Sequence, residues 1–402
     1  MSGEDRTAVV AGGSMAGLFA GNLLLRAGWD VEVCERATAN LDARGAGIGT
    51  HDELFEAMGK AGAKVDELIG IQVQGRAAYD AKGSEIARFD YPQYLTSWGL
   101  LYRRLHAALP ADRYKLGRSV VDVIDGDAAT TVVFADGSQR TADLVVGADG
   151  SWSTVRERCT PDEMPGYCGY VAWRGLLEES AMPQDFRERY ARFLNFFMNE
   201  DQQLICYPVA GADDSVAVGR RRFSFLWYRP YDAETELASL LTDDDGHRHR
   251  YQIPPTRISS RHIERLHREA AEMLPPDFAR LIRAIERPFL QPIYDMIPSQ
   301  IAFRRVALIG DAACVARPHV GAGVAKAATD ATALVAVLEA TASVPDALQA
   351  FQDQRQPFGR ALVERGRYLG AYLEWPQTDR RHVQTLPTEE IIRESAMLMH
   401  IP

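Results

Sequence analysis

The first residues whose types and spacing suggest a binding function form a glycine-rich turn near the start of the chain. Gly12 and Gly17 follow a short apolar run, residues 7–11, and the acidic Glu35 ends the next apolar run. In dinucleotide-binding units such glycines let the backbone approach a pyrophosphate, and the acid accepts hydrogen bonds from a ribose. The pattern predicts a site for the ADP half of a dinucleotide, with Ser14 where a glycine is usual. The turn alone leaves NAD and FAD both open.

The segments around this turn have the pattern of a βαβ unit. Residues 7–11 are predicted to be a strand buried on both faces, residues 18–27 a tightly packed helix, and residues 30–35 a second strand. Two later apolar runs, 144–148 and 306–309, have the composition of further strands in the same sheet. Between them lie runs rich in aromatic and β-branched residues, which predict an antiparallel sheet: 170–176, 204–209 and 223–227.

These patterns predict a mixed α/β and α+β fold. A Rossmann-like cofactor domain is interleaved with an antiparallel-sheet substrate domain, and a helical C-terminal region follows. Since no second βαβ opening occurs, the segments of each domain are expected to be discontinuous. The expected boundaries are 1–73, 100–165 and 295–340 for the cofactor domain, 74–99 and 166–294 for the substrate domain, and 341–402 for the helical region.

The composition limits the kinds of molecule that the protein is expected to bind. The 402 residues are 46% hydrophobic and 25% charged, as in ordinary globular proteins, and the formal charge of −10 disfavours nucleic acid or an anionic membrane. There is no candidate membrane span and no secretory leader pattern, so a cytoplasmic location is expected. The five cysteines have neither redox-pair nor metal-ligand spacing, and the histidines form no metal-binding group, so no metal site is expected.

Two further motifs follow the later strands. Asp149 and Gly150 lie in DLVVGADGSWSTVR, residues 143–156, and Asp311 lies in VALIGDAACVARPHVGAGVAKAATDA, residues 306–331. Taken alone, Asp149 is more often a strand-end cap or turn residue than a cofactor ligand, and Asp311 could equally be a helix N-cap. Their position after apolar strands, together with the glycine loop, favours a role in cofactor binding.

With the first turn, these motifs resemble the three signatures of the single-component (class A) FAD-dependent aromatic hydroxylases, which have the para-hydroxybenzoate hydroxylase fold. The resemblance covers nearly the whole chain in the same order. Within the family, RPHVGAGVAKAATDA, GYVAWRG (residues 169–175) and SFLWY (residues 224–228) are most similar to the 2,6-dihydroxypyridine 3-hydroxylases. The resemblance implies bound FAD, transient NADH or NADPH, O2, a small aromatic substrate and a homodimer.

The resemblance also implies which residues bind the cofactor. Asp149 and Gly150 would serve both the pyrophosphate and NAD(P)H, and Asp311 would bind the ribityl chain. Tyr102 stands where many relatives have arginine, and Gly321-Ala322-Gly323 replaces Gly-Gln-Gly. The full expected set is Gly12, Ser14, Met15, Ala16, Gly17, Glu35, Arg36, Arg44, Gly47, Tyr102, Asp149, Gly150, Asp311, Pro318, Gly321, Ala322 and Gly323.

The chemistry that the resemblance implies is oxygen transfer from a flavin C4a-hydroperoxide to an electron-rich ring such as a hydroxypyridine or a phenol. His319 is the candidate for accepting the ring proton, although a histidine here could equally stabilise its own loop. Tyr207 and Tyr170 are candidate hydrogen-bond donors to the ring. The aromatic residues Trp173, Phe225 and Trp227 could wall the substrate or form ordinary core.

Other readings remain open. The same scaffold could serve an oxidase or reductase that inserts no oxygen, or a flavin-binding sensor. A flavin halogenase is disfavoured because the chain has no Trp-x-Trp-x-Ile-Pro run, and a disulfide reductase because it has no redox cysteine pair.

Overall fold

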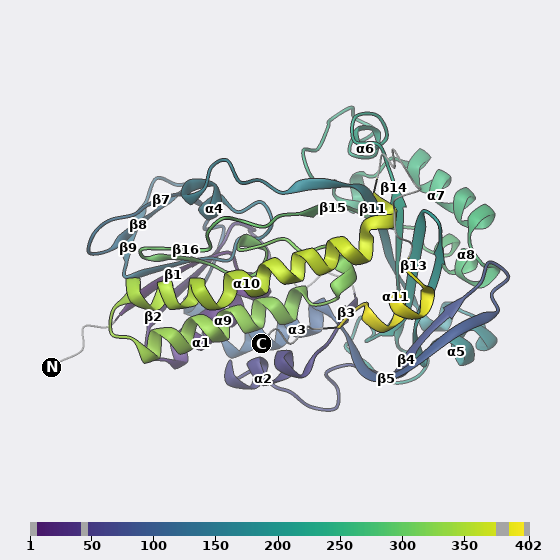
Figure 1. Cartoon of the computed structure of the whole chain (residues 1–402), viewed down its shortest axis with the longest axis horizontal. Coiled ribbons are helices and arrows are strands. Elements are labelled where there is room, and N and C mark those ends of the chain that lie inside the picture. Colours follow the sequence, from purple (N-terminus) through teal and green to yellow (C-terminus); the bar gives the residue numbers. More distant parts are fainter. Residues whose placement is uncertain (1–5, 42–46, 375–385, 398–402) are drawn as a thin grey trace.

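The computed structural model describes residues 6–41, 47–374 and 386–397, and these form three sheets with helices packed around them. The two larger sheets occupy opposite ends of the molecule, and the long helix α10 (Val344–Gly370) runs from one towards the other (Figure 1). The expected mixed fold, with a Rossmann-like part, a second sheet and a helical C-terminal region, is confirmed.

The first sheet is the Rossmann-like one, with strand order β16-β17-β10-β1-β2-β6. Its strands pair in parallel, except that the two-residue β16 is antiparallel to β17. The strands are β1 (Thr7–Ala11), β2 (Asp30–Glu35), β6 (Tyr114–Leu116), β10 (Leu144–Gly147), β16 (Ala302–Phe303) and β17 (Val306–Leu308). The helices of this half are α1 (Met15–Arg26), α2 (Asp52–Lys60), α3 (Trp98–Ala108), α4 (Thr154–Cys159) and α9 (Gly323–Ala340).

The second sheet has strand order β15-β11-β14-β13-β12-β4-β5-β3. It is antiparallel as expected, with one exception: β12 pairs with β4 in parallel. Its strands are β3 (Gly47–Gly49), β4 (Ile71–Tyr79), β5 (Glu85–Ser97), β11 (Gly166–Glu178), β12 (Phe193–Asn199), β13 (Gln202–Val209), β14 (Arg222–Pro230) and β15 (Phe289–Asp295). Strand β3 and the start of β4 belong to this sheet, although the expected boundary grouped residues up to 73 with the cofactor domain.

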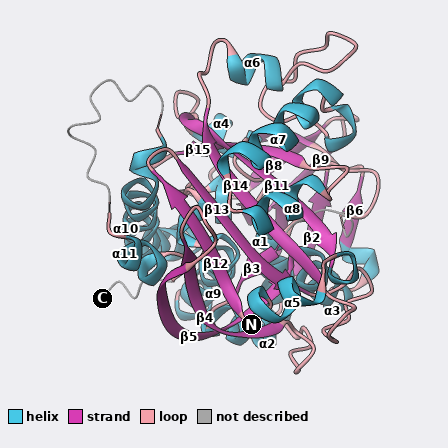
Figure 2. Cartoon of the chain, turned by 90° about the vertical axis from the view of Figure 1, so that its right-hand side faces the viewer, coloured by secondary structure: helices cyan, strands magenta, loops and turns pink. Residues whose placement is uncertain are grey.

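The two faces of this sheet are covered differently because side chains alternate along each strand. One face packs against a group of helices, seen in front of the strands in Figure 2: α5 (Gln184–Tyr190), α6 (Glu236–Leu240), α7 (Ser260–Met273) and α8 (Pro276–Arg283). Trp173, Phe225 and Trp227 are buried on that face, so they are core residues and not a substrate wall. The opposite face packs against the end of α10 and α11 (Thr388–Glu394). None of the described helices is long and apolar enough to span a bilayer.

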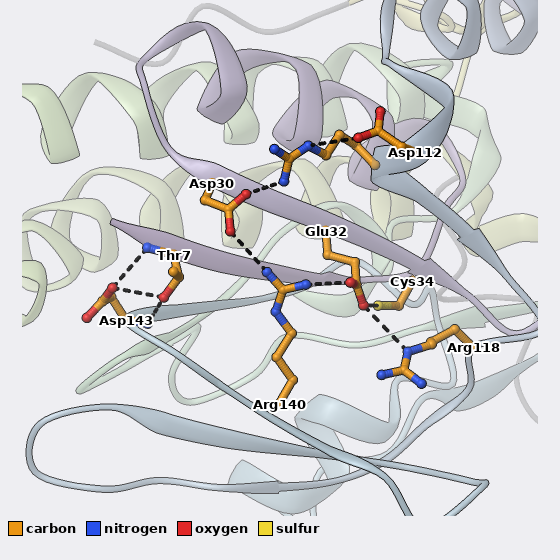
Figure 3. Close-up of polar contacts among 9 residues, drawn as sticks. Thr7, Asp30, Glu32, Cys34, Asp112, Arg118, Arg140 and Asp143 are labelled. Atoms are coloured by element: carbon orange, nitrogen blue, oxygen red, sulfur yellow. Dashed lines mark hydrogen bonds and ion pairs between the residues drawn. The ribbon is translucent and has the colours of Figure 1, made fainter. Parts of the chain in front are cut away.

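A small third sheet, β7 (Val120–Ile124), β8 (Thr130–Phe134) and β9 (Gln139–Ala142), is joined to the Rossmann-like sheet by charged contacts (Figure 3). The Arg140 guanidinium on β9 lies between two carboxylates of β2: it pairs with Asp30 at 3.3 Å and with Glu32. Arg118 contacts the same Glu32 carboxylate at 3.5 Å. These groups are partly buried, so the contacts are less screened by solvent than an exposed ion pair.

Replacing Arg140 by Met is expected to lower the free energy of unfolding by about 1 kcal/mol, because it leaves two carboxylates of β2 without this cation. Urea denaturation of both proteins measures the difference. Arg304→Met is the matched control: its partner Asp127 has a side chain 90% exposed, and this variant is expected to cost much less. Equal losses in the two variants would show that the Arg140 contacts add nothing specific.

Candidate active site

A cavity of about 570 Å³ lies between the carboxyl ends of the Rossmann-like strands and the uncovered part of the second sheet. One end is lined by the glycine turn after β1 and by residues that follow β2, the middle by Asp149, Gly150 and Asp311, and the other end by side chains of the second sheet. Ligands of open α/β folds bind at this edge of the sheet, where strands end and helices begin.

The glycine turn brings the N-terminus of α1 to the cavity. Gly12 has φ +105°, and a Cβ there would lie 2.3 Å from the Ala148 carbonyl oxygen; a Cβ on Gly17 would lie 1.8 Å from the Gly12 carbonyl oxygen. Only glycine therefore permits this close approach of helix and strand. Ser14 caps the helix without a side-chain hydrogen bond, and Ser14, Met15 and Ala16 line the cavity. The amides and dipole of this helix end favour an anion such as a pyrophosphate.

Glu35 lines the cavity and also holds the turn in place. Its carboxylate accepts hydrogen bonds from the backbone amides of Gly13 and Ala37, both at 2.8 Å. Tyr102, in contrast, does not line the cavity. Its hydroxyl lies 3.1 Å from that of Tyr114, which donates to the Gly13 carbonyl at 2.9 Å. The structure thus places Tyr102 behind the turn, as a support, and not at the expected cofactor surface.

The two aspartates of the later motifs have different surroundings. The Asp149 carboxylate accepts hydrogen bonds from the Ser153 hydroxyl and the Thr154 amide, so it caps α4 while lining the cavity. The Asp311 side chain lines the cavity, and among the described residues its carboxylate accepts one hydrogen bond, from the Ser151 hydroxyl at 3.4 Å. The surrounding protein desolvates Asp311 and raises its pKa, while the Lys326 charge opposes that shift. Asp311 is therefore the acid with free acceptor capacity for a hydroxylated ligand.

The loop before α9 forms the wall near the second sheet. Pro318, Gly321, Ala322 and Gly323 all line the cavity, and α9 starts at Gly323 without a side-chain cap, so a second helix N-terminus faces it. Across the cavity Gly47 packs on Tyr207: a Cβ on Gly47 would lie 2.2 Å from the tyrosine ring. Arg36 and Gly150 also line the cavity, whereas Gly17 lies just behind it and Arg44 lies outside the described residues.

His319 lines the cavity but both of its ring nitrogens have protein partners. Nε2 lies 3.0 Å from the Tyr170 hydroxyl and Nδ1 lies 3.0 Å from Gln203 Oε1. Burial and the nearby Arg317 charge lower the pKa of His319 to about 3, so the ring is neutral at physiological pH. With its proton on Nδ1, the ring donates to Gln203 and accepts from Tyr170, whose pKa burial raises. The ring can accept a substrate proton only if one of these hydrogen bonds breaks.

The two tyrosines named from the sequence take different places. Tyr207 lines the cavity, while Tyr170 lies behind His319 and contacts it. Sequence reasoning missed further lining residues: Arg174, Tyr228 and Gln291 of the second sheet, Arg118 near Glu35, and Ser395 and Ala396 from the C-terminal end. Arg174 and Tyr228 lie within the GYVAWRG and SFLWY motifs. Because side chains alternate along a strand, Arg174 is expected on the same face of the sheet as Tyr170, four residues earlier.

This lining fits FAD along its length. The glycine turn, the α1 N-terminus and Glu35 suit the ADP half, Asp311 has acceptor capacity for a polyhydroxyl chain, and the α9 N-terminus suits the electron-rich edge of a reduced flavin. The second sheet supplies an aromatic and aliphatic end for a ring substrate. The fold and site thus define an FAD-dependent oxidoreductase with a buried chamber for a small aromatic compound.

Comparisons with known proteins agree. The family model described as "FAD binding domain-like" matches residues 167–295. The chain is 30% identical to 2,6-dihydroxypyridine 3-monooxygenase of Paenarthrobacter nicotinovorans, over 92% of each protein, and 30% identical to 3-amino-4-hydroxybenzoate 2-monooxygenase of Streptomyces cremeus, over 94% of this chain and 90% of that one. The solved structure of 2,6-dihydroxypyridine-3-hydroxylase from Arthrobacter nicotinovorans matches with a TM-score of 0.86 and 28% identity, over 94% of this chain and 95% of that one.

The chain belongs to the family of FAD-dependent aromatic monooxygenases. The family resemblance, the enzyme class and the FAD cofactor expected from the sequence are therefore confirmed. The roles of individual residues stay predictions.

His319 is expected to make the protein acid-sensitive. Its folded pKa lies below its unfolded value, so the unfolded chain gains the proton first as the pH falls, and stability is lost between about pH 6.5 and about pH 3. Between about pH 7 and about pH 5 the loss from this residue should be about 2 kcal/mol. Urea denaturation of wild type and His319→Asn at both pH values measures it: the variant should lose less stability on acidification.

His247→Asn is the control, because it replaces an exposed histidine outside the cavity lining with the same residue. If His319→Asn retains the full acid sensitivity of the wild type, His319 is not held neutral by the fold.

Proposed function

We propose that the protein hydroxylates an electron-rich hydroxypyridine, such as 2,6-dihydroxypyridine, or a similar phenolic ring, bound as an anion against Arg174. The observation that carries the proposal is a cavity-lining guanidinium on the second sheet that has no carboxylate partner among the described residues. The similarity to 2,6-dihydroxypyridine 3-monooxygenase supports the same substrate class.

Arg174 lies on β11, on the face of the sheet that lines the cavity. Its Nη1 donates to Gln291 Oε1 at 2.8 Å, and its Nε is buried without a partner. Within the described part of the chain no carboxylate forms an ion pair with it. Charged groups removed from water are stabilised by an opposite charge, and a guanidinium suits oxyanions because its N–H donors are planar. A deprotonated ring hydroxyl would supply that charge.

The remaining walls suit a flat ring. Leu194, Phe196, Ile205 and Leu226 give apolar surface, and the hydroxyls of Tyr207 and Tyr228 lie on the same face. Burial raises the pKa of both tyrosines, so they remain protonated and act as hydrogen-bond donors. Such a chamber orients the ring and keeps out water, while Arg174 and the two hydroxyl donors favour the anionic form, in which the ring carbons are more nucleophilic.

In the overall reaction NADH or NADPH supplies two electrons, one atom of O2 enters the ring as a hydroxyl group, and the other leaves as water. Bound FAD supplies the capacity to take up hydride and activate O2. Three further points belong to this proposal: the use of NADH or NADPH, a homodimeric assembly and a cytoplasmic location. They follow from the family resemblance and from composition.

The direct test follows NADH and NADPH oxidation in air by the purified yellow protein, with and without 2,6-dihydroxypyridine. Oxidation is expected to accelerate with the substrate, and mass spectrometry should find a product heavier by one oxygen atom. Hydroxypyridines and phenols with other substituents extend the panel. Reduction of the flavin without an oxygenated product from any of them would support an oxidase or reductase instead.

Arg174→Met should raise the KM for the anionic ring by roughly 10- to 100-fold, because it removes a charge-assisted contact, with a smaller change in kcat. Steady-state kinetics at a pH where the ring is ionised measures both constants. Arg220→Met, which changes an exposed arginine paired with Asp213, should leave them unchanged. An unaltered KM in Arg174→Met would contradict an anionic binding mode.

A further inference from the structure

The last described part of the chain, residues 386–397, is here called the C-terminal segment; it carries α11 and lies against β4 and β5 (Figure 1). This segment reaches the cavity: Ser395 and Ala396 are lining residues, next to the glycine loop before α9. Part of the cavity wall beside this loop therefore comes from residues more than 70 positions further along the chain.

The segment is held by a buried cation. Arg76 on β4 is 1% exposed, and its guanidinium donates to the carbonyls of Ile392 and Arg393, both at 2.9 Å, and of Ala396 at 3.1 Å. No carboxylate of the described residues forms an ion pair with Arg76. Its charge is instead compensated by carbonyls at the C-terminal end of α11, where the helix dipole is negative.

The segment is also bonded directly to the loop before α9. The Ala396 amide donates to the His319 carbonyl at 3.0 Å, and Gln93 Nε2 donates to the Ala396 carbonyl at 3.2 Å. Ala396 has φ +52°, a left-handed conformation that a residue with a Cβ adopts only when its surroundings impose it. The approach to the loop is close, since a Cβ on Gly321 would lie 2.5 Å from the Ala396 Cα.

Ser395, a residue of this wall, has a hydroxyl with unused hydrogen-bonding capacity. The residue is 2% exposed, and its Oγ is buried without a hydrogen-bond partner. Burying a hydroxyl without a partner is unfavourable, so a hydroxyl in this state at a ligand cavity is suited to a polar substituent of the ligand.

We propose that the C-terminal segment completes the reaction chamber, with Ser395 contacting a polar substituent of the aromatic substrate and Arg76 acting as the positioning residue that holds the segment closed. This inference rests on the proposed hydroxylation. Arg76 touches neither substrate nor cofactor; it acts through the segment, which excludes water from the reacting ring.

The test uses the full-length FAD-loaded protein and the Arg76→Lys variant. Lysine keeps the charge but cannot bond three carbonyls in the fixed fork geometry of arginine. Hydrogen exchange of the α11 amides should become roughly 10-fold faster or more, because the segment opens locally. In the oxidation assay, the ratio of hydrogen peroxide to hydroxylated product should rise about 5-fold, because water reaches the chamber. Arg88→Lys, on the adjacent strand β5 with an exposed partner Glu85, is the matched control for both readouts.

Ser395→Ala tests the hydroxyl separately. It should raise the KM for the substrate roughly 3- to 10-fold, as loss of one hydrogen bond does, without faster exchange in α11. An unchanged KM and an unchanged peroxide ratio would overturn the role of Ser395, and this variant decides that point even if Arg76→Lys does not fold.

The remaining outcomes distinguish a failure of this inference from a failure of the proposed hydroxylation. Unchanged exchange in Arg76→Lys would overturn the anchoring role, and faster exchange with an unchanged peroxide ratio would overturn the role of the segment as a chamber wall. If wild type hydroxylates no ring, the proposed function fails and the substrate role of Ser395 fails with it, while the exchange data still decide whether Arg76 holds the segment.

Discussion

The shape of the cavity depends on how the loop of residues 317–323 is held between the two large sheets. The His319 ring is bonded to Gln203 on β13 and Tyr170 on β11, while its backbone carbonyl accepts from Ala396. Helix α9 begins directly after this loop, so the same bonds aim its N-terminus at the cavity. A neutral, buried imidazole suits this task because it can donate and accept at once without a desolvated charge.

The local electrostatics of the cavity oppose the overall charge of the chain. The protein carries a formal charge of −10, yet two helix N-termini face the cavity, as does Arg174, which forms no ion pair with a carboxylate of the described residues. A diphosphate, a reduced flavin and an ionised ring are all anionic, so these groups would favour their binding. Net charge indicates which macromolecules the surface repels; it does not describe a site shielded from solvent.

Much of the fold could be predicted because its signals are local. The strand, glycine turn, helix and second strand of the opening unit lie within residues 7–35, and the glycine spacing itself requires the close approach that the structure shows at Gly12 and Gly17. Family membership followed from three such motifs in order, and the comparisons confirm it. Tyr102 shows the limit of such local signals. Its place in the sequence suggested a contact with the cofactor, but its hydroxyl contacts that of Tyr114 behind the turn.

The sequence by itself determined the class of enzyme, the cofactor and the edge of the Rossmann-like sheet where the glycine turn and the acids meet, since these depend on backbone geometry that a few adjacent residues encode. Only the tertiary structure decided which side chains of the second sheet line the cavity. Trp173 and Arg174 are neighbours in one strand, so their side chains point to opposite faces of the sheet. Helices cover the face of Trp173, which makes it a core residue, while Arg174 lines the cavity on the other face. The contacts of His319 with Gln203 and of Arg76 with α11 join residues 116 and more than 300 positions apart, and no local pattern specifies such pairs.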